Sequence, residues 1–247
     1  MSANKTILVV GASKGIGFAT SKMLLEKGYS VIAVSRNVET LKDAFQTDIN
    51  VNFFSYDFSQ IDSIQSFAED VNNECGPING IVCSAGTQLT MPMSMNKPDT
   101  VKKIFSLNTF APIEIIRCFS KKKMISENGA SFVLISSLSA HEGSIGQSLY
   151  GASKGAIEGF LAPASAELID RKIRLNVVIP GMVLTDMSSE FLNNLAPDKR
   201  EKLESTYPLG LGEPNDVASL ITWLISDESK WVTGQSYIID GGHMIRG

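Results

Sequence analysis

The stretch Thr6-Ile-Leu-Val-Val10-Gly11-Ala-Ser-Lys-Gly15-Ile-Gly17 joins an apolar run, rich in β-branched residues, to three closely spaced glycines. Such a run is typical of a strand that is buried on both faces of a parallel sheet. Apolar residues then recur at helical spacing as far as Gly28, which predicts a helix that ends at this glycine. Glycines let the backbone approach a phosphate closely, and a helix N-terminus offers free N–H groups. The unit therefore predicts a pyrophosphate site.

The residues after the second predicted strand, residues 31–34, favour one kind of dinucleotide. NAD-binding folds usually have a carboxylate here that binds the ribose 2′-hydroxyl, whereas this chain has Ser35 and Arg36. A planar guanidinium suits a 2′-phosphate, and Lys14 adds a second cation in the glycine turn. We therefore expect NADP(H) as cofactor. The alternative is that both cations are ordinary surface charges.

Strands and helices alternate along the rest of the chain. Further strands are predicted at residues 51–54, 80–83, 132–135, 172–179 and 237–239. Helices are predicted at residues 61–74, 100–123 and 215–225, and another begins near Tyr150. This order predicts an α/β fold with one domain, residues 1–247. Its doubly wound parallel sheet would have about seven strands, with helices on both faces.

Three residues around the fifth strand are the candidates for chemistry. Tyr150 and Lys154 are one helical turn apart, so their side chains share a face. An ammonium group beside a phenol favours the phenolate, and so lowers the phenol pKa from about 10. Ser137 follows the strand and could donate a hydrogen bond to a substrate oxygen. Taken alone, Tyr-x-x-x-Lys is also compatible with a surface Tyr and Lys.

Two prolines predict irregular helices. Pro112 cannot donate an N–H to the carbonyl of Asn108, so the long helix should be distorted there, with Asn108 facing the active site. A solvent-facing Asn108 is the alternative. Pro163 predicts a kink or an early break in the helix of Tyr150. Asp57, just past the third strand, could accept from the adenine amino group or cap the next helix.

Composition excludes several classes of protein. The net charge is -4 with no basic stripe, which argues against nucleic acid as a partner. No apolar run approaches the ~20 residues that span a bilayer, so no membrane association is expected. Three separated cysteines predict free thiols in a reducing compartment, here the cytoplasm. With two histidines and no Cys-x-x-Cys, no metal is expected. His141 is interpreted as an unpaired loop residue.

In their joint order these residues resemble the short-chain dehydrogenase/reductases, in the single-domain branch, over nearly the whole chain. The motifs that carry the resemblance are the glycine turn, Asp57, Ala85-Gly86, Asn108, Ser137, Tyr150-x-x-x-Lys154, Pro180-Gly181 with Thr185, and Asp240-Gly241-Gly242. The resemblance implies a Rossmann fold. It also implies an NADP-dependent oxidoreductase that reduces a carbonyl to a secondary alcohol.

The same resemblance implies a role for each site residue. Tyr150 would be the general acid, Lys154 would lower its pKa and hold the nicotinamide ribose, and Ser137 would orient the carbonyl. Asn108 would hold a water in a proton relay. The implied cofactor-binding residues are Gly11, Ser13, Lys14, Gly15, Ile16, Gly17, Ser35, Arg36, Asp57, Phe58, Ser84, Ala85, Gly86, Asn108, Tyr150, Lys154, Pro180, Gly181, Val183 and Thr185. Residues 182–212, after a strand's C-terminal end, are expected to form a mobile substrate lid.

Two positions depart from the family pattern. Cys83-Ser84 replaces the usual Asn-Asn, which affects a side-chain contribution to cofactor positioning. Pro163 falls in the helix through which such proteins assemble, so a homo-oligomer, either tetramer or dimer, is implied without its exact packing.

The C-terminal part resembles the 3-oxoacyl-[acyl-carrier-protein] reductases of fatty acid biosynthesis. Arg171 stands where those enzymes dock the acidic carrier, whereas the second docking arginine is missing from residues 127–130. Lys121, Lys122 and Lys123 could compensate. The substrate would be a small-molecule or acyl-carrier-bound carbonyl. Two alternatives stay open. One is a ketoreductase or alcohol dehydrogenase for a sugar, polyol or secondary-metabolite carbonyl. The other is a non-catalytic NADP(H)-binding sensor.

Overall fold

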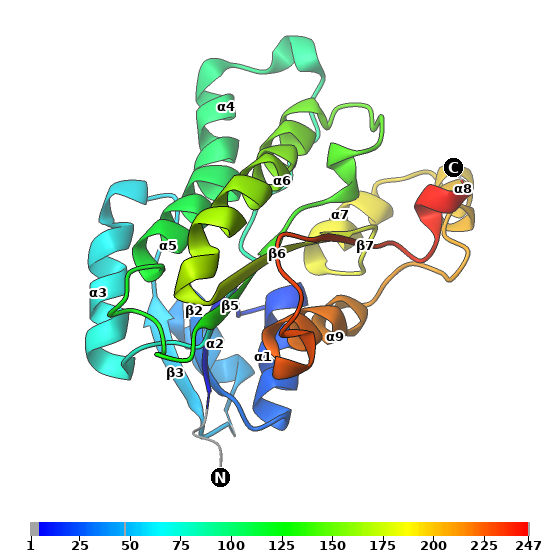
Figure 1. Cartoon of the computed structure of the whole chain (residues 1–247). Coiled ribbons are helices and arrows are strands. Elements are labelled where there is room, and N and C mark those ends of the chain that lie inside the picture. The colour runs from blue at the N-terminus through cyan, green and yellow to red at the C-terminus, as the bar shows by residue number, and fades with distance from the viewer. Residues whose placement is uncertain (1–4, 47, 247) are drawn as a thin grey trace.

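The computed structural model describes residues 5–46 and 48–246 and is built around one parallel sheet (Figure 1). Its seven strands have the order β3-β2-β1-β4-β5-β6-β7. Their bounds are β1 Thr6–Val10, β2 Ser30–Ser35, β3 Val51–Ser55, β4 Gly80–Cys83, β5 Ala130–Ile135, β6 Ile173–Pro180 and β7 Ser236–Ile239. The predicted doubly wound parallel sheet is confirmed.

Helices cover both faces of the sheet because strand residues alternate between two apolar cores. Leu8 and Val10 of β1 enter one core, and Ile7 and Val9 enter the other. The first core is covered by α3 (Ile64–Cys75), α5 (Ala111–Phe119) and α6 (Ser148–Leu168). The second is covered by α1 (Gly15–Glu26), α2 (Val38–Ala44) and α9 (Pro214–Ile225). The remaining helices are α4 (Pro98–Phe105), α7 (Asp186–Asn193) and α8 (Pro197–Ser205).

The order of the strands places a crevice at the carboxyl ends of the strands. β1 pairs with β2 on one side and with β4 on the other, so the chain reverses its winding direction beside β1. Loops that leave the carboxyl ends of strands on the two sides of such a switch point diverge, and ligands bind between them. The glycine turn after β1 lies at this point.

The long helix predicted at residues 100–123 is divided at the predicted place. A π-helical segment, Ser106–Phe110, separates α4 from α5 and contains Asn108. Pro112 explains the division, because it has no N–H for the carbonyl of Asn108. The predicted distortion at Asn108 is therefore confirmed.

The early break expected at Pro163 is wrong, and the alternative, a kink, stays a prediction. Helix α6 continues for five residues beyond this proline, to Leu168. Pro163 has no N–H to donate to the carbonyl of Gly159. Both residues are exposed, so water can hydrogen-bond this carbonyl instead.

The expected lid, residues 182–212, contains two short helices, α7 and α8. A parallel bridge between Val183 and Gly212 closes its base, with Leu184 N donating to Gly212 O at 2.7 Å. The Tyr207 hydroxyl accepts from Met182 N at 3.2 Å across the same base. The motion of this segment stays a prediction.

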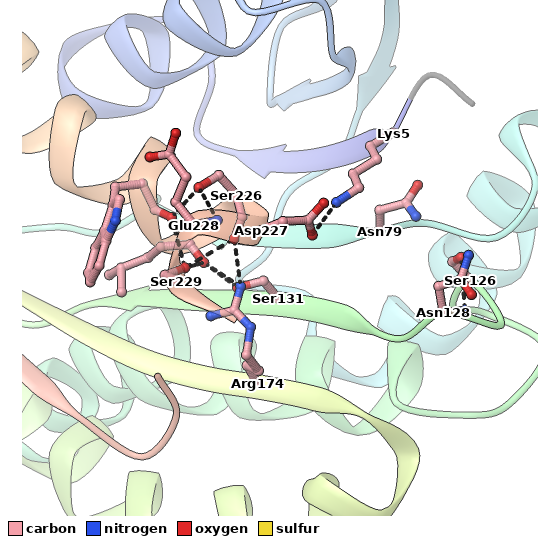
Figure 2. Close-up of polar contacts among 12 residues, drawn as sticks. Lys5, Asn79, Ser126, Asn128, Ser131, Arg174, Ser226, Asp227, Glu228 and Ser229 are labelled. Atoms are coloured by element: carbon pink, nitrogen blue, oxygen red, sulfur yellow. Dashed lines mark hydrogen bonds and ion pairs between the residues drawn. The ribbon is translucent and has the colours of Figure 1, made fainter. Parts of the chain in front are cut away.

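At the amino ends of the strands, opposite the glycine turn, Arg174 near the start of β6 holds several segments together (Figure 2). Its guanidinium donates to the carbonyls of Leu224 (2.8 Å), Ser226 (3.2 Å) and Val232 (3.0 Å). The Ser131 hydroxyl donates to the Leu224 carbonyl as well, at 2.7 Å. A cation suits the carboxyl end of α9, where carbonyls lack helical partners. These contacts fasten the scaffold far from the glycine turn.

Candidate active site

The glycine turn after β1 is packed too closely for side chains. A Cβ atom at Gly17 would lie 2.2 Å from the Gly11 carbonyl oxygen, and one at Gly11 would lie 2.8 Å from Ala85 N. Gly15 has φ +56, and its Cβ would lie 3.3 Å from the Thr185 methyl group. The turn therefore meets the loops after β4 and β6, which brings together three of the predicted cofactor-binding segments.

The turn leads into a helix end that fits an anion. Lys14 is the N-cap of α1 and makes no side-chain capping bond, so the first N–H groups of α1 are available. The turn is fixed from behind, since Gly11 N and Ala12 N donate to the Val34 carbonyl at 2.9 and 3.1 Å. Ser13 and Ile16 complete the turn, and Ile16 packs against the core. This cradle fits the pyrophosphate of a dinucleotide.

The residues after β2 and β3 adopt ordinary turn contacts. The Ser35 hydroxyl donates to the Asn37 carbonyl at 2.7 Å, and the Asp57 carboxylate accepts from Ser59 N at 3.0 Å. This bond lowers the pKa of Asp57, to which the charge of Arg36 also contributes. Arg36 therefore lies close enough to Asp57 to act on it. The alternative that Asp57 caps the next helix is wrong, because Gln60 is the N-cap of the helical turn Ile61–Ser63 and Ser63 is that of α3, and a contact of Asp57 with adenine stays a prediction.

Two other predicted cofactor residues are directed elsewhere. The Lys14 amine lies 3.5 Å from the Asp186 carboxylate, an exposed pair of small energetic value. The Phe58 side chain is buried in the core, with its ring 4.8 Å from that of Tyr56 and 5.4 Å from that of Phe67. A cofactor contact of Phe58 would have to come from its backbone.

Ser137, Tyr150 and Lys154 converge at the carboxyl end of β5. The Lys154 amine is buried and donates to the Ile135 carbonyl at 2.8 Å. The Ser137 hydroxyl hydrogen-bonds the Tyr150 phenol. A Cβ atom at Gly86 would lie 3.4 Å from the Lys154 amine, so the loop after β4 covers this group. The three predicted catalytic residues thus lie together, and the loop after β4 contacts both Lys154, at Gly86, and the glycine turn, at Ala85.

The pKa of Tyr150 differs from its expected direction. Burial raises it, and the hydrogen bond from Ser137 only partly opposes that rise. The expected lowering by Lys154 is not found, because desolvation of the phenol dominates and the amine is bonded to the Ile135 carbonyl. Burial also lowers the pKa of Lys154 to about 8. At neutral pH, Tyr150 therefore carries its proton and Lys154 remains mostly charged.

Asn108 is buried and all its side-chain contacts are internal. Its Oδ1 accepts from Thr87 N at 2.8 Å, and its Nδ2 donates to the Thr87 carbonyl at 2.9 Å and to the Ser153 hydroxyl at 3.0 Å. Ser153 in turn donates to the Tyr150 carbonyl at 2.8 Å. Asn108 therefore joins the loop after β4 to the helix of Tyr150, and the solvent-facing alternative is wrong.

The segment after β6 supplies the remaining predicted residues. Gly181 N donates to the Ile239 carbonyl at 2.9 Å, which follows from the β6–β7 pairing that includes Pro180. Val183 is buried, and the Thr185 hydroxyl accepts from Ser188 N at 3.4 Å as the N-cap of α7.

In the loop after β4, Ser84 N donates to the Val10 carbonyl at 3.0 Å. Cys83 is buried beside it, which raises its thiol pKa to about 12.

Several contacts around the site were missed from the sequence. His141 is not unpaired, since its Nε2 lies 2.8 Å from the Glu158 carboxylate, which also accepts from Ser136 at 2.6 Å. His243 stacks on Tyr207, with ring centroids 4.4 Å apart, and lies 3.0 Å from the Glu142 carboxylate. The sequence gives little signal for these pairs, because the partners are far apart in the chain. His141 and Glu158 are 17 residues apart and belong to one strand–helix unit, whereas His243 and Glu142 do not.

Three findings concern metal, disulfide and membrane-spanning features of the residues that the structure describes. In this part of the chain there is no group of three or more His, Cys, Asp or Glu that could hold a metal ion. Its three cysteines are free. None of its helices has both the length and the apolar character needed to cross a bilayer.

Comparison with known proteins agrees with this geometry. Residues 11–244 match the family model described as Enoyl-(Acyl carrier protein) reductase. Carbonyl reductase family member 4 of Xenopus laevis is 36% identical over 97% of this chain and 98% of its own length. The 3-oxoacyl-[acyl-carrier-protein] reductase of Mus musculus is 33% identical over 97% of this chain and 98% of its own length.

A solved structure has the same arrangement of elements. It is a short-chain dehydrogenase/reductase, glucose/ribitol dehydrogenase, from Brucella melitensis. It superposes with a TM-score of 0.89 at 26% identity, over 97% of this chain and 96% of that one. With a family model matched along nearly all of its length, and relatives above 30% identity, the chain belongs to the short-chain dehydrogenase/reductase family of oxidoreductases.

Proposed function

We propose that the protein is an NADPH-dependent reductase that converts a 3-oxoacyl thioester into the 3-hydroxyacyl thioester. The observation that carries the proposal is the convergence of Ser137, Tyr150 and Lys154 at the end of β5, next to the glycine cradle. A protein that only bound the nucleotide would have little use for a half-buried phenol that is hydrogen-bonded to a serine.

Each side chain has a distinct part in the reduction. When bound, NADPH supplies the hydride for the carbonyl carbon. Tyr150 holds a proton at neutral pH and donates it to the carbonyl oxygen, which Ser137 orients. The Lys154 amine is mostly charged at pH 7 but is bonded to the Ile135 carbonyl, so its proposed part is to hold the nicotinamide ribose.

Asn108 contributes through its position in the π-helical segment. Its side chain fixes the loop after β4, and its carbonyl has no N–H partner at Pro112. In the proposed relay, the Asn108 carbonyl would hold the water that returns a proton to Tyr150.

The cofactor preference rests on Arg36, which lies near Asp57 at the end of β2 where an NAD-binding fold has an acid. Replacing Arg36 with Asp removes the cation and adds a repelling charge. We expect the Kd of NADPH to rise about 10–100-fold, and that of NADH to change about threefold at most. Fluorescence titration with both nucleotides measures this. Equal affinity of the parent protein for the two would contradict the NADP(H) assignment.

The acyl substrate is favoured by the relatives' names and by a cationic surface. Arg171 donates to the Ser120 carbonyl at 2.7 Å, which places it beside the exposed residues Lys121, Lys122 and Lys123. This surface suits an acidic acyl carrier protein. We further propose that the protein acts as a homo-oligomer, a dimer or tetramer, in the cytoplasm, in fatty acid biosynthesis. Its free thiols suit a reducing compartment.

NADPH consumption with a panel of carbonyl compounds tests the function. We expect acetoacetyl thioesters to be reduced with a higher kcat/KM than simple ketones, keto-sugars or crotonyl thioester. A preference for keto-sugars would favour the polyol or sugar alternative. NADPH binding without turnover of any carbonyl would favour the sensor.

A further inference from the structure

The short helical turn Leu138–Ala140 begins just past the end of β5 and lies directly against α6. It contacts the helix at two residues that have no side chain. A Cβ atom at Gly151 would overlap the Ser139 carbonyl oxygen, and one at Gly155 would lie 3.7 Å from the Ala140 methyl group. The two glycines are one helical turn apart, so the turn lies along one face of α6.

Glu158 lies farther along this face of α6, three residues after Gly155. Its carboxylate joins the chain on both sides of the turn. Oε1 accepts from the Ser136 hydroxyl at 2.6 Å, and Oε2 lies 2.8 Å from Nε2 of His141, the C-cap of the turn. A carboxylate accepts hydrogen bonds and donates none, so both partners donate to Glu158.

This carboxylate is connected to the groups that we assign to the reduction. Ser137, which follows Ser136 directly, hydrogen-bonds the Tyr150 phenol. The buried Ser136 hydroxyl also donates to the Lys154 carbonyl, at 3.1 Å. The backbone that carries Ser137 is thus fastened to the helix that carries Tyr150, at Lys154 and at Glu158. The separation of the two hydroxyl groups depends on these contacts.

Stability alone does not explain a carboxylate at this place. The Glu158 side chain is 17% exposed, and the loss of its water offsets much of what its hydrogen bonds contribute. Two donors on opposite sides of one turn do, however, fix the orientation of that turn on the helix. An apolar side chain of the same size would pack here without fixing it.

We propose that Glu158 is a positioning residue, which holds the turn after Ser137 on α6 and so sets the geometry of the Ser137–Tyr150 hydrogen bond. This inference rests on the proposed function and goes beyond it. Both hydroxyl groups meet the carbonyl oxygen during reduction, so a displacement of one relative to the other weakens the transition state more than the binding of substrate. Glu158 itself acts only through Ser136 and His141.

The variant Glu158→Met tests this, because methionine keeps the length of the side chain but has no carboxylate. With saturating NADPH and acetoacetyl-N-acetylcysteamine, we expect the single-turnover rate constant of reduction to fall about 10-fold, as one weakened hydrogen bond in the transition state implies. The KM of the thioester and the Kd of NADPH should change about twofold at most. Glu167→Met, at an exposed position of α6, is the matched control and should leave all three values unchanged.

Two further variants separate positioning from folding. Glu158→Gln keeps an oxygen that accepts from Ser136, so its rate constant should stay within about threefold of that of the parent. Ser136→Ala removes the same bond from the other side and should lower the rate constant about threefold or more, which tests the role even where Glu158→Met does not fold. In the double variant, Ser136→Ala should add little to the loss in Glu158→Met, because both changes break one contact.

Three results would overturn the role of Glu158 while leaving the proposed function intact. They are an unchanged rate constant in Glu158→Met, a glutamine variant as slow as the methionine variant, and equal changes in the rate constant, the KM and the Kd. The last of these would assign Glu158 to the general architecture of the fold. If the parent protein does not reduce the thioester, the proposed function fails and this inference fails with it.

Discussion

Tyr150→Phe should lower kcat for carbonyl reduction by about 10²–10⁴-fold, the usual contribution of a general acid. The phenol is protonated at neutral pH because burial raises its pKa, so the substitution removes the proton that the carbonyl oxygen receives. The benzene ring keeps its volume, and the glycine cradle is unaffected. The Kd of NADPH should therefore change about threefold at most. Stopped-flow reduction and fluorescence titration measure the two quantities.

Tyr29→Phe is the matched control for this variant. Tyr29 lies at the amino end of β2, whereas the site lies at the carboxyl ends of the strands. Removal of its hydroxyl group should therefore leave turnover unchanged. Retention of full activity in Tyr150→Phe would exclude this residue as the acid. Loss of NADPH binding in the same variant would instead assign Tyr150 to the architecture of the cofactor site.

The second large effect is expected from Gly17→Ala. The added Cβ would lie 2.2 Å from the Gly11 carbonyl, and backbone at that distance must move. We expect a loss of about 1–3 kcal/mol in the free energy of unfolding, as for other overpacked sites. The Kd of NADPH should rise more than about 100-fold, because the displaced turn is the one that fits the pyrophosphate. Urea denaturation and nucleotide titration test the two parts.

Gly159→Ala provides the comparison for the same chemical change. A Cβ atom there would have no neighbour within 4 Å, and the residue lies inside α6. Alanine favours a helix over glycine, so stability should rise by about 0.5–1 kcal/mol. Unchanged NADPH affinity in Gly17→Ala would show that the turn after β1 tolerates a side chain and is not the nucleotide cradle.

Much of the fold follows from local sequence signals. The strands and the helix of the glycine turn were predictable because their apolar periods are long and end at glycines or prolines. The distortion at Asn108 was predictable because Pro112 removes one identifiable N–H group. Helix α2 was not predicted. It has seven residues, of which only Leu41 is buried, and this is too short to give a helical period.

The sequence was a better guide to which residues form the site than to their pKa values and hydrogen-bond partners. Spacing alone places Lys154 one turn from Tyr150, but it does not reveal that the amine is bonded to the Ile135 carbonyl or that burial governs the phenol. The His141–Glu158 and His243–Glu142 contacts depend on how loops meet in three dimensions. Helix α6 can continue through Pro163 because this residue is exposed, and a sequence pattern does not reveal that exposure.

The packing of α1 against α9 has a consequence for biosynthesis. The ribosome makes α1 early, yet its covering partner begins at Pro214, nearly two hundred residues later. At about 5–20 residues per second, the nascent chain exposes this apolar helix for roughly 10–40 s. A chaperone that shields exposed hydrophobic surface would act on this protein during that interval, before the nucleotide cradle has a stable support.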